Sequence, residues 1–341
     1  MRRAWGLAVL LGCAGCVTIK ERHLLMDPLI GVDDPVTDIR GDVSVETTYA
    51  ALIEETGGEA GVFGGALIEF GGDVVIARES GDTELQAYRL TEGGVQGVDV
   101  RRVNLGSPGR QVSAVQGEGV LSRSDAPLIV YCSGTANTID TTTLLSVNKV
   151  GPYAGAFFVF DYPGYGRSEG ARSVAGIERA VAVVADEVSR PDSRPLVLWG
   201  YSLGGFACAE LAARVPADAV ILDSPVRNAA EGIDFFVPRW LRPVARPFVR
   251  FDPALERFDI VESLAGLDTP ILVIGAERDG ILPEAGARSL FVALEAAGHD
   301  VAYVLAEKEG HYGMRDGDEV AEAVYRLLDV SHLDGLVPRE E

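Results

Sequence analysis

GYSLGG, at residues 200–205, is the stretch of sequence that decides the fold. An apolar run at 195–199 precedes it, and a run of small residues typical of a helix, 206–213, follows it. The pattern predicts a strand, a sharp turn flanked by glycines, and a helix, with Ser202 at the tip of the turn. A serine in that place is exposed above the sheet, beside a helix N-terminus that favours developing negative charge. Ser202 is therefore the candidate nucleophile.

Strand and helix patterns alternate along residues 98–330. Two stretches of alternating polar and apolar residues come first, and continuous apolar runs, typical of strands buried on both faces, follow them. The predicted strands are 98–103, 111–115, 127–132, 156–161, 195–199, 218–222, 270–275 and 301–305. Helical patterns lie between or after them at 140–149, 173–189, 203–214, 284–297 and 317–329. This order predicts an α/β fold with a mostly parallel, eight-stranded sheet flanked by helices, and with active residues at the carboxyl ends of its strands.

A serine nucleophile needs a base to take its proton, and the base needs an acceptor that holds its tautomer. His311 is the expected base because it lies in the loop after the last predicted strand. The other three histidines lie near the N-terminus, before that strand or in the C-terminal tail. Asp279, just after the strand at 270–275, is the preferred acceptor, and Asp223, at the end of an earlier strand, is the alternative.

With these residues in place, the chain resembles the α/β-hydrolase superfamily over about residues 98–330. Nucleophile, acid and histidine follow in the order of that family, and DYPGYGRSEG at 161–170 is similar to its D-x-x-G-x-G-x-S loop. SGT at 133–135 stands where the family usually has His-Gly-x. The pattern is most similar to lid-less serine hydrolases of acyl esters, thioesters or monoacylglycerols. It is also similar to the C-terminal domains of prolyl-oligopeptidase-type peptidases.

An oxyanion intermediate needs two backbone N–H donors placed in advance. Leu203, directly after the nucleophile, is expected to supply one of them, and the resemblance implies Thr135 as the other. Ser133 stands where relatives carry His, a departure that bears on the support of this loop and on substrate preference. No metal or other cofactor is expected, since the cysteines and histidines show no metal-ligand spacing.

Residues 225–268 form an insertion between two predicted strands. Its aromatic residues favour either a small cap that lines an acyl pocket or a surface helix docked through those rings. Phe236 and Trp240 are the candidates for the pocket wall. An insertion of about 40 residues is too short for an independent lid domain, so an open site is expected.

The N-terminus resembles the signal peptide of bacterial lipoproteins. A basic start at residues 1–3 leads into an apolar run at 4–12 that is too short to span a bilayer. Two cysteines follow, and Cys16 or Cys13 is expected to carry the lipid, with an ordinary cleaved signal peptide as the alternative. The prediction is a signal peptide over residues 1–16 and a lipid-anchored protein of the bacterial cell envelope, periplasmic or surface-facing.

Residues 17–97 fall outside the hydrolase pattern and are interpreted as a tether and N-terminal extension of unknown role. The short apolar runs at 66–70 and 74–77 fit either a hairpin or packed helix ends. At the other end, residues 331–341 form a predicted C-terminal tail.

Cys132 and Cys208 remain after the predicted signal peptide. Both are interpreted as small buried hydrophobic residues, because one lies in a predicted strand and the other in a predicted helix. A bridge between them stays open at this point, since its geometry cannot be judged from sequence.

Composition narrows the range of partners. A net charge of −21 argues against nucleic acid, which needs a basic patch, and against electrostatic docking on an anionic membrane.

The sequence predicts a serine hydrolase that cleaves a carboxylic ester or thioester of a small-molecule or lipid-like acyl substrate through an acyl-enzyme intermediate. The alternatives are a serine peptidase of the prolyl-oligopeptidase type and a catalytically silent envelope binding lipoprotein.

Overall fold

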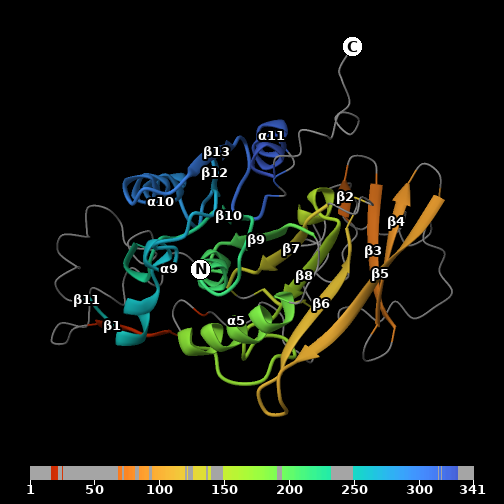
Figure 1. Ribbon diagram of the computed structural model, residues 1–341, viewed down its shortest axis with the longest axis horizontal. Helices are drawn as coiled ribbons and strands as arrows, with labels where there is room; N and C mark the ends of the chain where they lie inside the picture. The colour runs from red at the N-terminus through yellow and green to blue at the C-terminus, as the bar shows by residue number, and fades with distance from the viewer. Residues whose placement is uncertain are drawn as a thin grey trace.

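A sheet of eleven strands organises the protein, which is represented by a computed structural model (Figure 1). The structure describes residues 17–21, 25, 68–70, 73–80, 84–91, 94–119, 121, 126–135, 137–139, 149–189, 194–231, 249–313, 315 and 317–328. In sheet order the strands are β13 (Val301–Ala306), β12 (Ile271–Ala276), β10 (Ala219–Asp223), β9 (Leu196–Tyr201), β7 (Leu128–Cys132), β8 (Ala156–Phe160), β6 (Val112–Glu118), β5 (Gly94–Leu105), β4 (Glu84–Thr91), β3 (Asp73–Ser80) and β2 (Ile68–Phe70).

The eight strands predicted from the sequence all form, and they run from β13 to β5. Five neighbouring pairs, from β13 to β8, are parallel, and the pairs from β8 onward are antiparallel. The predicted number of strands is too small, because β4, β3 and β2 add a further antiparallel edge. Figure 1 shows these strands beyond β6, on the side of the sheet opposite β13.

The three added strands also revise the interpretation of residues 17–97. The predicted boundary at residue 97 falls inside β5, whose ladder with β4 is unbroken from Gly94 to Arg101. β2 and β3 pair as a hairpin, with Ile68 opposite Val75, so the hairpin alternative is confirmed. This part of the extension continues the sheet and does not pack on it as a separate layer.

The start of the described chain lies far from that edge. β1 (Val17–Ile19) pairs in parallel with β11 (Val249–Phe251), a strand of the predicted insertion. Glu21 accepts a hydrogen bond from the Val174 N–H at 2.8 Å, and Leu25 is buried in the core. A tether is predicted here, yet these residues hold the chain against the domain. The signal peptide, both of its cysteines and the predicted tail lie outside the described residues.

Helices cover both faces of the parallel half. They are α5 (Val174–Val188), α6 (Gly204–Ala212) and α10 (Glu284–Ala296) on one face and α11 (Asp318–Leu327) on the other. Successive strand residues enter opposite cores: Leu198 packs in the core with α5 and α6, and Trp199 in the core with α11. Burial on both faces explains why these strands are continuous apolar runs. No helix in the described ranges is long and apolar enough to cross a membrane.

The described end of the insertion docks on the nucleophile side of the sheet. It contains η3 (Pro253–Arg257) and α9 (Ile260–Ser263), and Asp259 caps α9 by accepting the Val261 N–H at 2.9 Å. Phe258, between the two, stacks on Phe206 of α6 with ring centroids 4.5 Å apart. The pocket-wall candidates Phe236 and Trp240 lie outside the described residues.

Candidate functional site

Ser202 occupies a strained turn between β9 and α6. Its φ of 54° lies in the left-handed region, which non-glycine residues rarely adopt and which clusters at functional sites. Its N–H donates to the Asp223 carbonyl at 2.8 Å. Gly204 must lack a side chain, because a Cβ there would lie 1.8 Å from the Cys132 carbonyl oxygen. The glycine lets the helix start directly against the end of β7, so the turn can form.

Asp279 and His311 lie together at the carboxyl edge of the sheet. Asp279 follows β12, His311 follows β13, and these strands are parallel neighbours. His311 Nδ1 and Asp279 Oδ2 are 2.6 Å apart, and both residues are buried. The other carboxylate oxygen, Oδ1, accepts the N–H groups of Ile281 at 2.8 Å and Leu282 at 2.7 Å. These bonds fix the carboxylate, which in turn orients the imidazole.

Tyr201 brings His311 up to the serine turn. Its hydroxyl donates to the His311 carbonyl at 2.9 Å, and the two rings are 5.1 Å apart. Burial raises the pKa of Tyr201 well above its usual value, so the hydroxyl stays protonated and donates. Tyr201, the residue before Ser202, therefore contacts His311 through both its hydroxyl and its ring.

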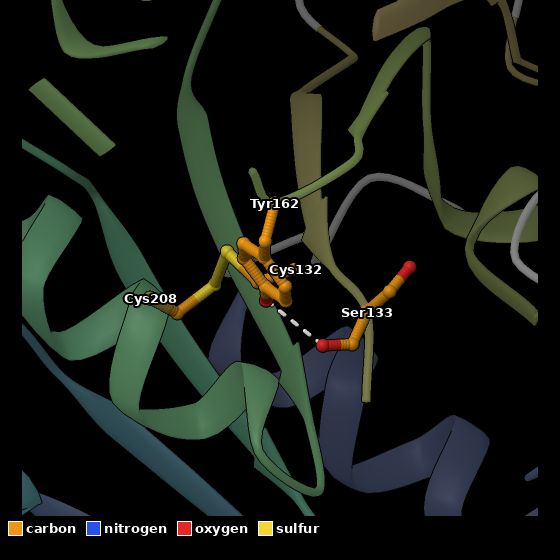
Figure 2. Close-up of a disulfide and its surroundings, with 4 residues drawn as sticks. All are labelled: Cys132, Ser133, Tyr162 and Cys208. Carbon is orange, nitrogen blue, oxygen red and sulfur yellow. Dashed lines mark hydrogen bonds between the residues drawn. A yellow bond between two sulfur atoms is a disulfide. The ribbon is translucent and has the colours of Figure 1, made fainter. Parts of the chain in front are cut away.

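The loop at 133–135 lies against the same turn. A Cβ on Gly134 would be 3.1 Å from the Tyr201 ring and 3.3 Å from Ser202 Cβ. Tyr162 donates to the Ser133 carbonyl at 2.8 Å (Figure 2), and Thr135 Oγ1 lies 3.3 Å from the hydroxyl of Tyr165. Two tyrosines of the 161–170 loop therefore support the segment that is expected to carry an oxyanion donor.

A disulfide links the elements that carry the two expected oxyanion donors. Cys132, the last residue of β7, is bonded to Cys208 of α6, and their Cα atoms are 6.0 Å apart (Figure 2). Both cysteines are fully buried, as the sequence predicts, and the bridge that the sequence left open is formed. Leu203 is the N-cap of α6, and the N–H groups at a helix N-terminus have no partner within the helix.

Asp223, the alternative acid, is bonded to two cations and not to His311. Its carboxylate accepts from Lys149 Nζ at 3.0 Å and from Arg315 Nε at 2.8 Å. Burial alone would raise the pKa of Asp223, but Arg315 and Lys149 outweigh it and hold the pKa below its usual value. Arg315 also pairs with Glu309. Sequence reasoning missed these cations, because a lone basic residue carries no pattern that predicts burial.

A cavity of about 540 Å³ is lined by residues of the insertion. It is lined by Asn228, Ala229, Ala230, Arg250, Phe251, Leu255, Glu256, Phe258 and Asp259. None of the proposed catalytic side chains belongs to its lining. Within the described part of the chain, no group of three or more His, Cys, Asp or Glu residues could hold a metal ion.

Parts of this chain are similar in sequence to known proteins. Residues 142–263 match the alpha/beta hydrolase family. An uncharacterized protein of Mycobacterium tuberculosis is 29% identical over 212 residues, which are 61% of this chain and 71% of that protein. The lysophosphatidylserine lipase ABHD12 of Danio rerio is 32% identical over 173 residues, 47% of this chain and 45% of the lipase.

The fold is also similar to that of a solved protein. That protein is an alpha-beta hydrolase from Vibrio vulnificus, which aligns with a TM-score of 0.51 and 18% identity over 69% of this chain and 81% of that one. At that identity the likeness concerns the fold alone.

Proposed function

The chain has the α/β-hydrolase fold, and we propose that it is a serine hydrolase whose nucleophile is Ser202. His311 is the general base and Asp279 its acceptor. The N–H groups of Leu203 and Thr135 bind the oxyanion. The observation that supports the proposal is the 2.6 Å contact between His311 and Asp279, together with the bond from the hydroxyl of Tyr201, the neighbour of the strained Ser202, to the His311 carbonyl.

Each group has a defined task in this reaction. His311 takes the proton of Ser202 as the hydroxyl attacks the acyl carbon, and Asp279 stabilises the imidazolium that forms. The oxyanion then receives two N–H donors in a site that is already organised. Collapse of the intermediate expels the alcohol or thiol, which takes the proton from His311. Water repeats the sequence to release the acid.

The substrate class is a carboxylic ester or thioester of small or lipid-like acyl groups. The likeness to a lysophosphatidylserine lipase supports a lipid-like acyl ester as one class within it. A serine peptidase of the prolyl-oligopeptidase type would use the same three residues, and peptidyl substrates tested beside acyl esters distinguish the two. A silent binding lipoprotein would leave Ser202 unreactive.

A fluorophosphonate probe tests the nucleophile. The wild-type protein should be labelled covalently on the peptide that carries Ser202, and Ser202→Ala should not be labelled. Ser263→Ala is the matched control, because the Ser263 hydroxyl bonds Glu210 and the Asp259 carbonyl on α9, away from the triad. Equal labelling of Ser202→Ala and wild type would refute the assignment.

We also propose that the protein is anchored to the bacterial envelope through a lipid on Cys16 or Cys13. Mass spectrometry of the N-terminal peptide from a bacterial host should find an acylated cysteine. An unmodified N-terminus that begins elsewhere would refute the anchor.

A further inference from the structure

Unusual backbone conformations cluster around the candidate triad. Among the residues that the structure describes, four non-glycine residues have positive φ, and three of them are Ser202, Ser224 and Arg315. Hydrogen bonds connect these three: the Ser202 N–H donates to the carbonyl of Asp223, and Arg315 Nη2 donates to Ser224 Oγ at 2.8 Å. Such strained conformations persist only where several surrounding contacts hold the backbone in place.

Arg315 is the centre of this network. Its side chain is fully buried, with Nε bonded to Asp223 and Nη1 paired with Glu309. The guanidinium also reaches the main chain of the histidine loop, with Nη1 3.1 Å from the Gly310 carbonyl and Nη2 3.4 Å from the His311 carbonyl. One planar group thus links the histidine loop to the end of β10, whose Asp223 carbonyl accepts the Ser202 N–H.

Stability alone is a poor reason for such a network. Buried ion pairs are often no more stabilising than apolar residues of the same volume, because desolvation offsets the attraction between the charges. What a guanidinium adds is geometry, since its rigid fork fixes several acceptors at once. Here the acceptors belong to the histidine loop and to the end of β10, which is bonded in turn to the Ser202 N–H.

We propose that Arg315 and Tyr201 are positioning residues that fix the His311 main chain relative to Ser202. This inference rests on the proposed function of the triad. Arg315 and the Tyr201 hydroxyl both donate to the His311 carbonyl, and Arg315 reaches the serine turn through Asp223 and Ser224. Neither side chain takes part in proton transfer.

Two conservative variants test the proposal. Tyr201→Phe keeps the ring against His311 and removes the hydroxyl, and Arg315→Lys keeps the charge and removes the fork. Each should lower kcat on the order of 10- to 100-fold, since a misplacement of about 1 Å costs about that much, while KM stays within about twofold. Arg288→Lys and Tyr303→Phe are matched controls on α10 and β13. They disturb another Arg–Glu–Tyr contact, with Arg288 Nε and the Tyr303 hydroxyl 2.8 and 2.6 Å from Glu284.

A double-variant cycle separates positioning from a general structural role. If Arg315 and Tyr201 act through His311, either variant should change the residual kcat of His311→Ala by less than about twofold. A loss in that background equal to the loss in wild type would overturn the proposal. Full kcat in both single variants would overturn it as well. If Arg315→Lys does not fold, Tyr201→Phe alone decides the outcome.

A spectroscopic readout keeps this inference distinct from the proposed function. The Nδ1 proton shared by His311 and Asp279 should give a low-field NMR signal that is absent from His311→Ala. Tyr201→Phe and Arg315→Lys should shift or broaden that signal without substrate, and the two controls should leave it in place. An unlabelled, inactive wild type would reject the hydrolase, whereas an unmoved signal in both variants would reject the positioning role.

Discussion

Reduction of the Cys132–Cys208 disulfide should destabilise the protein strongly. The bond closes a loop with a sequence separation of 76 residues, which contains β8, α5, β9 and the serine turn. In the chain-entropy model, a cross-link over that separation stabilises the folded state by about 4.5 kcal/mol at 25 °C. In a domain of this size, about 1 kcal/mol moves Tm by about 2–4 °C, so the reduced protein should melt about 10–20 °C lower.

Thermal unfolding with and without a thiol reductant measures this effect. Cys132→Ala/Cys208→Ala is the control, because it should melt near the temperature of the reduced wild type and should not respond to reductant. The bond also joins β7 to α6, so reduction should slow the labelling of Ser202 by a phosphonate at temperatures where the protein is still folded. Equal Tm values for oxidised and reduced wild type would refute the reasoning.

Three further predictions concern acidic and aromatic side chains near the triad. Asp279→Asn should lower kcat in steady-state kinetics on the order of 10⁴-fold, because an amide cannot hold the His311 tautomer. Asp223→Asn should lower the free energy of urea unfolding by about 3–5 kcal/mol, because it leaves cations buried without their partner. Burial alone would raise the pKa of Asp223, but Arg315 and Lys149 lower it overall. The stability that the ionised Asp223 contributes is complete above the pKa of this group in the unfolded chain, and it is lost as pH falls through the lower pKa of the folded protein. Wild type should therefore lose stability below about pH 4 more steeply than Asp223→Asn. Tyr312 is 63% exposed, and its ring lies 5.4 Å from that of His311, so Tyr312→Ala should raise KM severalfold and leave kcat nearly unchanged. Val292→Ala, at a residue of α10 that is 53% exposed, is the control and should change neither constant. A fall in kcat alone would contradict a substrate contact at Tyr312.

The parallel half of the sheet could be predicted because burial on both faces leaves a strong signal. A strand such as Ile271–Ala276 is buried at every position, and it therefore contains no polar or charged side chain. The position of Ser202 and the order of the acid and the histidine then placed three candidate residues at one edge. The structure brings Asp279 and His311 into contact and bonds the His311 carbonyl to Tyr201, the residue before Ser202.

The rest depends on contacts that leave little trace in the sequence. β2, β3 and β4 are antiparallel strands whose short apolar runs fit a hairpin as well as helix ends. Arg315 and Lys149 are single basic residues in polar surroundings, and only the tertiary fold brings them to Asp223. The disulfide could not be predicted because it depends on the Cα–Cα distance between the two cysteines, which their spacing in the sequence does not give.

The pairing of β1 with β11 bears on how far the protein could stand from a membrane. β1 begins at Val17, so a lipid on Cys16 would be separated from the folded domain by a single peptide bond. A disordered linker of 20 residues would let the domain lie about 25 Å from the lipid, whereas this arrangement allows almost no separation between them. The lipid would act as a pivot. It would hold the insertion strand Val249–Phe251 at the bilayer surface and restrict the domain to rotation about that point.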